Sequence, residues 1–293
     1  MSETVVRTQA RGLVTRRRIA VNPSTAMVAG VGLIVVVIGG ALLLMAFGQL
    51  DPNSTSPADR LQGIGTDGHV LGTDQLGRDM LSRAVSGLWW SVAVGSVSAC
   101  LVSGIGTVMG VWSASAEGWT RVVLTRFIDM SLSFPYLVLA VTIMAVIGRG
   151  FWPLSLTLGL VSWPIFARVV YAEAIGLMKR DYVLAARMFG VSRLRIVLTH
   201  ILPGIRNTLL VMWAFMFADL LIAESGLSFL GLGVPLGTPS LGSMLADSRE
   251  YLGQAPHMVL VPGLTIVVIV VAANLIGDAL SARSSQTSAV VNR

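Results

Sequence analysis

The sequence predicts an all-α integral membrane protein with six transmembrane helices, and three observations support this prediction. Apolar residues make up 54% of the 293 residues and charged residues only 12%, about half the charged share of soluble domains. The mean hydropathy is +0.76, so the chain has too few polar residues to cover a water-facing surface. Six stretches also approach the length of roughly 20 apolar residues that crosses a bilayer core. They are residues 25–47, 88–112, 130–148, 150–171, 207–223 and 256–280.

The first of these stretches follows three consecutive arginines at positions 16–18, an arrangement that also begins some export signals. However, the charge-free run extends over residues 19–50, whereas the apolar core of a cleavable signal has only about 7–15 residues. No small-x-small cleavage site follows it. We therefore expect an uncleaved helix over residues 25–47, preceded by a basic tail over residues 1–24.

A further charge-free stretch, residues 225–246, is long enough to cross a bilayer but differs in composition. Glycines and prolines interrupt it, and both residue types destabilise a helix interior. Irregular backbone persists at membrane depth only where protein or water satisfies its polar groups. We therefore predict that residues 224–250 form an external or re-entrant segment that lines a cavity, not a seventh helix. The interrupting residues are Gly226, Gly231, Gly233, Pro235, Gly237, Pro239 and Gly242.

Lysine and arginine are concentrated in segments that would share one side of the membrane. The tail 1–24 and the loop 175–206 carry five and six of them. The segments on the other side, which include the loop 48–83 and residues 224–250, hold five arginines beside eight acidic residues. Because basic loops mark the cytoplasmic side, we predict a cytoplasmic N-terminus and a cytoplasmic tail over residues 281–293. This placement accounts for the net charge of +6, so no nucleic-acid partner is expected.

The residues that most enzymes and metal sites require are sparse in this sequence. Lys179 is the only lysine and is followed by Arg180, so the Gly-Lys-Ser/Thr of a phosphate-binding loop is absent. The three histidines show no metal-ligand spacing, and the single cysteine, Cys100, lies in an apolar run. No Gly-x-Ser-x-Gly motif marks a serine nucleophile. The sequence therefore predicts a chain that is not an enzyme, with no catalytic residue, metal site or cofactor of its own.

The most informative segment is residues 181–203, within the basic loop. Apolar residues recur at helical spacing on both sides of Gly190, which predicts two short amphipathic helices joined at that glycine. The aligned residues are Leu184, Met188 and Val191 in the first helix and Leu194, Leu198 and Ile201 in the second. Two interpretations remain open: a helix that lies on the membrane surface, and a plug that inserts into a groove of another protein.

The spacing of Ala185-Ala186, Gly190 and Leu202-Pro203 is similar to the EAA loop of permeases from binding-protein-dependent ABC importers. In that family the loop is the coupling helix that docks on the ATPase subunit. Two positions depart from the family pattern, because Leu184 stands where glutamate is usual and His200 where isoleucine is frequent. The resemblance implies that the ATPase-coupling residues are Asp181, Leu184, Ala185, Ala186, Gly190, Arg193, Leu202 and Pro203.

Two further segments resemble dipeptide and oligopeptide permeases of the C type. Residues 69–87, HVLGTDQLGRDMLSRAVSG, are similar to the motif at the entry to the second helix. Residues 223–247, AESGLSFLGLGVPLGTPSLGSMLAD, are similar to a later motif, with Leu241 in place of the usual tryptophan. The resemblance implies a five-helix ABC importer permease core over residues 84–280, preceded by one peripheral helix.

The resemblance also implies a function, namely one half of a translocation pathway for short peptides in a bacterial plasma membrane. Its partners would be a second homologous permease subunit, cytoplasmic ABC ATPase subunits that bind ATP and magnesium, and an extracytoplasmic substrate-binding protein. Nickel chelates, glutathione and haem remain open as substrates. The alternative of a different class is an ion-coupled secondary transporter with Asp219 or Glu173 as the ion site, although no inverted repeat supports it.

Four charged residues are candidates for contact with the pathway or with the binding protein: Asp74, Arg78, Asp219 and Glu224. Thr73 and Asp74 are expected to cap the second helix, with Asp79 near its positive end, and contact with the binding protein is the functional alternative. An unpaired carboxylate in hydrocarbon costs several kcal/mol. We therefore expect Asp219 to face either a partner on an adjacent helix or the amino group of a transported peptide.

Overall fold

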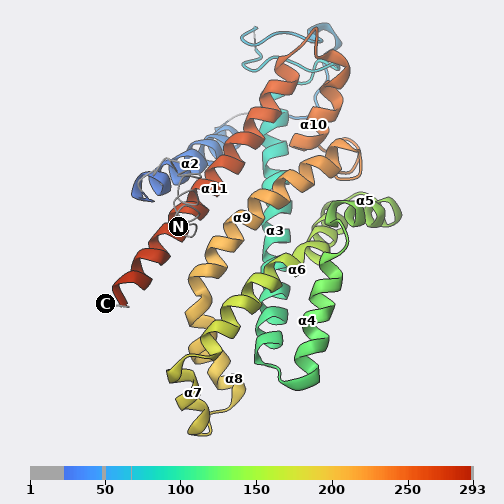
Figure 1. Cartoon of the computed structure of the whole chain (residues 1–293). Helices are drawn as coiled ribbons and strands as arrows, with labels where there is room; N and C mark the ends of the chain where they lie inside the picture. The colour runs from blue at the N-terminus through green and yellow to red at the C-terminus, as the bar shows by residue number, and fades with distance from the viewer. Residues whose placement is uncertain (1–22, 48–50, 67, 292–293) are drawn as a thin grey trace, which may run out of the picture.

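The computed structural model describes residues 23–47, 51–66 and 68–291, and these residues form helices and loops without a strand. Five of the described helices are long and apolar enough to cross a membrane. They are α2 (Pro23–Phe47), α3 (Met80–Ser115), α6 (Phe151–Met178), α9 (Leu202–Phe229) and α11 (His257–Val291) (Figure 1). The all-α membrane fold is therefore confirmed. Almost all of the predicted basic tail, residues 1–24, lies outside the described residues.

The third predicted span, residues 130–148, is two helices and not one. α4 (Gly118–Leu132) and α5 (Tyr136–Ile147) meet at an angle of 78°. Pro135 lies at the break, where it lacks an N–H donor and disfavours the helical conformation of the residue before it. If this bent pair is one span, the described residues contain six candidate spans, as the sequence predicted.

Several helices extend further than their apolar stretches. α3 begins at Met80, ahead of the predicted core boundary at residue 84, and α9 runs to Phe229 beyond the predicted residue 223. A span predicted from hydropathy ends at the first charged residue. Arg83 and Glu224, however, are both buried by protein. The helices therefore continue through positions where a lipid-exposed charge would have ended the span.

The glycine-rich segment does not form a spanning helix, but it is more ordered than its composition suggested. Its first residues complete α9, and a loop with positive φ angles at Gly231 and Gly237 follows. The chain then forms the short helices α10 (Leu241–Ser248) and η3 (Arg249–Tyr251). A Cβ atom on Gly242 would lie 2.1 Å from the carbonyl oxygen of Ser225, so glycine permits close packing of α10 on α9.

α3 and α6 pack closely along their lengths, and small residues make this possible. A Cβ atom on Gly106 would lie 2.8 Å from Cβ of Phe166, and one on Gly110 would lie 2.7 Å from the Ala167 carbonyl oxygen. Membrane helices often associate through such residues, because they let the backbones approach. These two helices therefore form the central pair of the core.

α2 lies at the periphery and packs mainly on α11 (Figure 1). A Cβ atom on Gly30 would lie 2.9 Å from the carbonyl oxygen of Ala272, whereas most side chains between residues 24 and 45 are exposed or half-buried. This arrangement fits a peripheral helix beside a core of α3, α4–α5, α6, α9 and α11.

Candidate functional site

The coupling segment predicted from the sequence forms a compact unit at one end of the molecule, opposite the loop that precedes α3 (Figure 1). It consists of α7 (Asp181–Met188), α8 (Arg193–Ile196) and the π-helix η2 (Val197–Ile201), which leads directly into α9. Gly190 joins α7 to α8 with a φ angle of +77°, which side-chain-bearing residues rarely adopt. The predicted break at this glycine is therefore confirmed.

The coupling unit has a small core of its own. Val183, Ile196 and Ile201 are buried against Ala114 at the end of α3 and against the last two turns of α6, at Ala174 and Met178. Burying an aliphatic side chain contributes about 1.5–3 kcal/mol, so this core holds the unit against both helices.

The apolar residues that align in the sequence are mostly not the ones buried within the chain. Leu184, Met188, Leu194 and Leu198 are exposed, and of the aligned set only Ile201 is fully buried. The most exposed apolar side chains of the unit are Met188 at 89% and Phe189 at 88%. They form an apolar tip beside Gly190.

The remaining predicted coupling residues lie along α7 and at the start of α9. Asp181 is exposed in the first turn of α7, where a carboxylate is stabilised by the helix dipole. Ala185 is exposed, Ala186 is half-buried in the small core, and Leu202 and Pro203 begin α9.

Glu117 is a residue of this site that the sequence did not reveal. It precedes α4, and its carboxylate accepts a hydrogen bond from Arg193 Nη2 at 2.7 Å and lies 3.8 Å from Arg187 Nη1. These contacts link the coupling unit to the turn between α3 and α4. The only sequence signal was a single acidic residue in a short loop, and its partners are distant in the chain.

At the other end of the molecule, Asp74 and Arg78 belong to a buried charge network. Asp74 accepts hydrogen bonds from the backbone N–H groups of Leu76 and Arg78 and, at 2.7 Å, from Arg78 Nε. Its carboxylate also lies 3.4 Å from Arg83 Nε, and Arg83 Nη2 lies 3.4 Å from Asp247 of α10. The network therefore ties the loop before α3 to α10.

The predicted caps of α3 are partly wrong. Asp79 is the N-cap and accepts a hydrogen bond from the Ser82 N–H at 2.7 Å. Thr73 instead accepts from the backbone N–H of Gln62 at 2.9 Å, inside the loop that precedes α3. Asp74 serves the charge network and not the helix end, because its hydrogen-bond partners precede the first turn.

The comparisons with known proteins decide the family. Residues 106–286, more than half of the chain, match the family described as "Binding-protein-dependent transport system inner membrane component". The chain belongs to this family. It is the permease component of a binding-protein-dependent ABC importer.

Relatives of this permease include peptide and glutathione permeases. The Dipeptide transport system permease protein DppC of Alkalihalophilus pseudofirmus is 34% identical over 85% of this chain and 83% of its own length. The Di/tripeptide transport system permease protein DppC of Pseudomonas aeruginosa is 37% identical over 77% and 74%. The Glutathione transport system permease protein GsiD of Pectobacterium atrosepticum is 35% identical over 76% and 74%.

A solved structure with a similar fold is an inward-facing conformation of the MetNI methionine ABC transporter. It matches with a TM-score of 0.57 and 19% identity, over 69% of this chain and 97% of that one. At this identity the likeness concerns the fold, and it agrees with the ABC permease core that the sequence predicted.

Within the core of the permease, Asp219 and Glu224 of α9 both have protein partners. Asp219 accepts a hydrogen bond from the Tyr136 hydroxyl of α5 at 3.3 Å. Glu224 is fully buried and accepts from the hydroxyls of Ser228 at 2.7 Å and Ser225 at 3.3 Å. The structure therefore gives each carboxylate a structural neighbour, and among the described residues no hydrogen bond or ion pair joins them to Asp74 or Arg78.

A further ion pair joins α6 to α4, between Arg168 Nη1 and Asp129 Oδ1 at 2.9 Å. Among the described residues, no group of three or more histidine, cysteine, aspartate or glutamate side chains is placed to hold a metal ion.

Proposed function

We propose that this permease forms one half of a translocation pathway for short peptides, driven by separate ATPase subunits that dock on α7 and α8. The peptide substrate class is supported by the names of the relatives, which are dipeptide, di/tripeptide and glutathione permeases. Glutathione is itself a modified tripeptide, so all three names describe small peptides. Nickel chelates and haem are the alternative cargoes for the same machinery.

The observation that carries the docking proposal is the apolar tip at Met188 and Phe189. Two large apolar side chains with nearly 90% of their surface exposed are unfavourable in water unless a partner covers them. A short helix with a protruding aromatic residue suits insertion into a groove of another protein. ATP and magnesium would be bound by that partner, and this chain would contribute no catalytic group.

The packing of the coupling unit suggests how a movement of the ATPases would be transmitted to the membrane helices. Its core lies against the ends of α3 and α6, so a displacement of α7 would move both helices together. η2 is continuous with α9, which gives a third route into the membrane. Alternating access through tilting of these helices is the mechanism that we infer.

A second permease subunit is supported by the apolar surface of the α4–α5 pair. Many of its large side chains are exposed, including Phe127, Phe134, Val138 and Val146. α5 packs on α6 and makes one side-chain hydrogen bond to α9. A homologous subunit with a similar fold would cover part of this surface and complete the pathway.

The orientation that we propose places the coupling unit and both chain ends in the cytoplasm, with the loop 48–83 and residues 224–250 outside. The arginine-rich loop 175–206 supports it. The external face would then carry the Asp74 network, where an extracytoplasmic substrate-binding protein would dock. Of the two ion-site candidates of the rival ion-coupled transporter, Asp219 already has a neutral partner, the Tyr136 hydroxyl, which disfavours that rival at Asp219.

Co-purification tests this function most directly. The tagged permease, expressed in its native cells, should retain ATPase subunits, and its deletion should abolish uptake of radiolabelled di- and tripeptides. Phe189→Asp should remove the ATPases, because it places a charge in the proposed contact. Leu236→Asp, at a leucine that is 88% exposed in the loop between α9 and α10, is the matched control for a charge on an apolar side chain away from the tip. Retention of the ATPases by Phe189→Asp would refute docking at the tip.

A further inference from the structure

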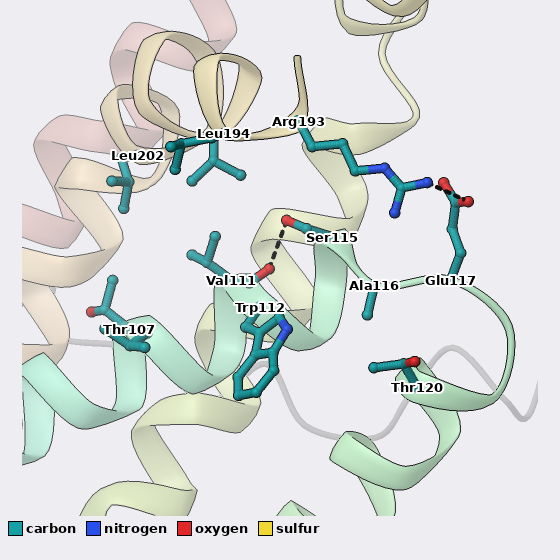
Figure 2. Close-up of a pocket in the computed structure, with 12 residues that line it drawn as sticks. Thr107, Val111, Trp112, Ser115, Ala116, Glu117, Thr120, Arg193, Leu194 and Leu202 are labelled. Carbon is teal, nitrogen blue, oxygen red and sulfur yellow. Dashed lines mark hydrogen bonds and ion pairs between the residues drawn. The ribbon is translucent and has the colours of Figure 1, made fainter.

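An open groove of about 610 Å³ lies between the end of α3, the start of α4 and the coupling unit. Figure 2 shows Val111, Leu194 and Leu202 around the hollow, with the Trp112 ring at its edge. The Arg193–Glu117 ion pair lies at one side. The groove is lined by Thr107, Val108, Val111, Trp112, Ser115, Ala116, Glu117, Thr120, Arg193, Leu194, Val197 and Leu202.

The size and lining of the groove suit a small amphipathic molecule. Its volume of about 610 Å³ falls within the range of about 300–1,000 Å³ that is typical of small-molecule sites. Most of the lining side chains are apolar, so a flexible hydrocarbon chain can lie along them.

Two tryptophans indicate the level of the groove relative to the membrane. Trp112 in the last turn of α3 and Trp119 in the first turn of α4 are 54% and 79% exposed. Exposed tryptophans gather at the boundary between lipid and water, where the ring meets both environments. The groove thus opens where a headgroup region meets an apolar wall.

The charges beside the groove are predominantly basic. Arg193 and Arg187 share the single carboxylate of Glu117. Arg121 donates from Nε to the carbonyl oxygen of Ala116, which lines the groove. Three guanidinium groups against one carboxylate leave a positive balance that complements a phosphate.

We propose that this groove binds an anionic phospholipid, with an acyl chain along Val111 and Leu194 and the phosphate near Arg193 and Arg121. The proposal rests on the orientation and function proposed above, which place the groove at the cytoplasmic leaflet. Leu194 and Val197 belong to the coupling unit, whereas Val111 belongs to α3. The bound lipid would therefore fill the space between the coupling unit and the core, and its loss would loosen their packing.

Photo-crosslinking tests the occupant. The assembled transporter, with p-benzoylphenylalanine in place of Leu194, is reconstituted in nanodiscs of phosphatidylcholine and phosphatidylglycerol and irradiated. We expect a product heavier by one phosphatidylglycerol molecule. The matched control is the same replacement at Leu198, which is exposed in η2 but does not line the groove. A product with another protein subunit, or equal lipid yields at both positions, would overturn the proposal.

Two substitutions test the chemistry of the site by native mass spectrometry of lipids retained by the complex. Arg193→Gln should lower phosphatidylglycerol retention about fivefold, the effect of one basic residue near an anionic surface. Arg126→Gln, an exposed arginine of α4 outside the groove, is the control and should retain the lipid. Thr107→Phe should fill the groove and release the lipid without changing any charge. Unchanged retention in both groove variants would refute the site.

The same preparation separates the two proposals. If the ATPases fail to co-purify with the unmodified permease, the proposed function is wrong. If they co-purify but Leu194 yields only protein adducts, the function stands and the lipid site is wrong.

Discussion

Replacing Gly190 with alanine should weaken ATPase docking while leaving the permease inserted in the membrane. Gly190 has a φ angle of +77°, and an L-residue in this left-handed region costs about 1–2 kcal/mol. A Cβ atom there would meet no heavy atom within 4 Å, so no steric cost is added. The backbone term alone lowers the ratio of correctly folded to unfolded loops by a factor of roughly 5–30.

The measurement is the affinity of purified ATPase subunits for the reconstituted permease, together with peptide uptake in cells. Gly190→Ala should reduce both, whereas thermal unfolding of the membrane core should change little, because the loop lies outside it. Gly190→Asn should be milder than Gly190→Ala, since asparagine tolerates the left-handed conformation. Gly190→Val should be more severe, because its side chain is β-branched.

Gly176→Ala provides the matched control. Gly176 lies in helix α6 without a positive φ angle, and a Cβ atom there also meets no heavy atom within 4 Å. Alanine stabilises a helix by about 0.5–1 kcal/mol relative to glycine, so this variant should dock normally. Equal effects of Gly176→Ala and Gly190→Ala, or an unchanged affinity in Gly190→Ala, would refute the reasoning from the backbone angle.

Two further predictions concern the external network and the orientation. Asp74→Asn removes the charge buried between two arginines and should cost about 3–5 kcal/mol of stability, measured by thermal unfolding of the purified permease. The control Glu250→Gln, at an exposed carboxylate, should cost less than about 0.5 kcal/mol, the usual range of surface substitutions. A normal melting temperature for Asp74→Asn would contradict the network. In a Cys100→Ser background, Thr66→Cys should react with an impermeant thiol reagent from outside intact cells and Ser192→Cys should not; the reverse pattern would invert the proposed topology.

The spans could be predicted from the sequence because lipid exposure leaves a compositional record, and the ends of the spans could not. Arg83 ended the second apolar stretch, yet α3 includes it, because Arg83 is buried and its guanidinium forms ion pairs with Asp74 and Asp247. Glu224 likewise ended the fifth predicted stretch, although α9 runs on to Phe229. A charged residue marks the end of a membrane span only where it would face lipid. Whether it faces lipid or a protein partner depends on tertiary packing, which the sequence alone does not reveal.

The coupling unit shows a second kind of limit. The glycine at 190 and the two short helices were predictable, because a helix break and helical spacing are local features. The buried face was not, since Val183 and Ile196 are buried by Ala114 and Met178 from other helices. The role of Glu117 was not predictable either, because its arginine partners are distant in sequence.

The contacts of the coupling unit also indicate which parts of the core would move together. α3 and α6 are in close backbone contact at Gly106 and Gly110, because even a methyl group would collide there. The core of the coupling unit then joins the ends of both helices. α5 is attached differently, by its packing on α6 and the hydrogen bond from Tyr136 to Asp219, and it is separated from α4 by the bend at Pro135. A push at the tip would therefore displace α3, α6 and the coupling unit as one body, and the bend before α5 is where the described core can absorb the change.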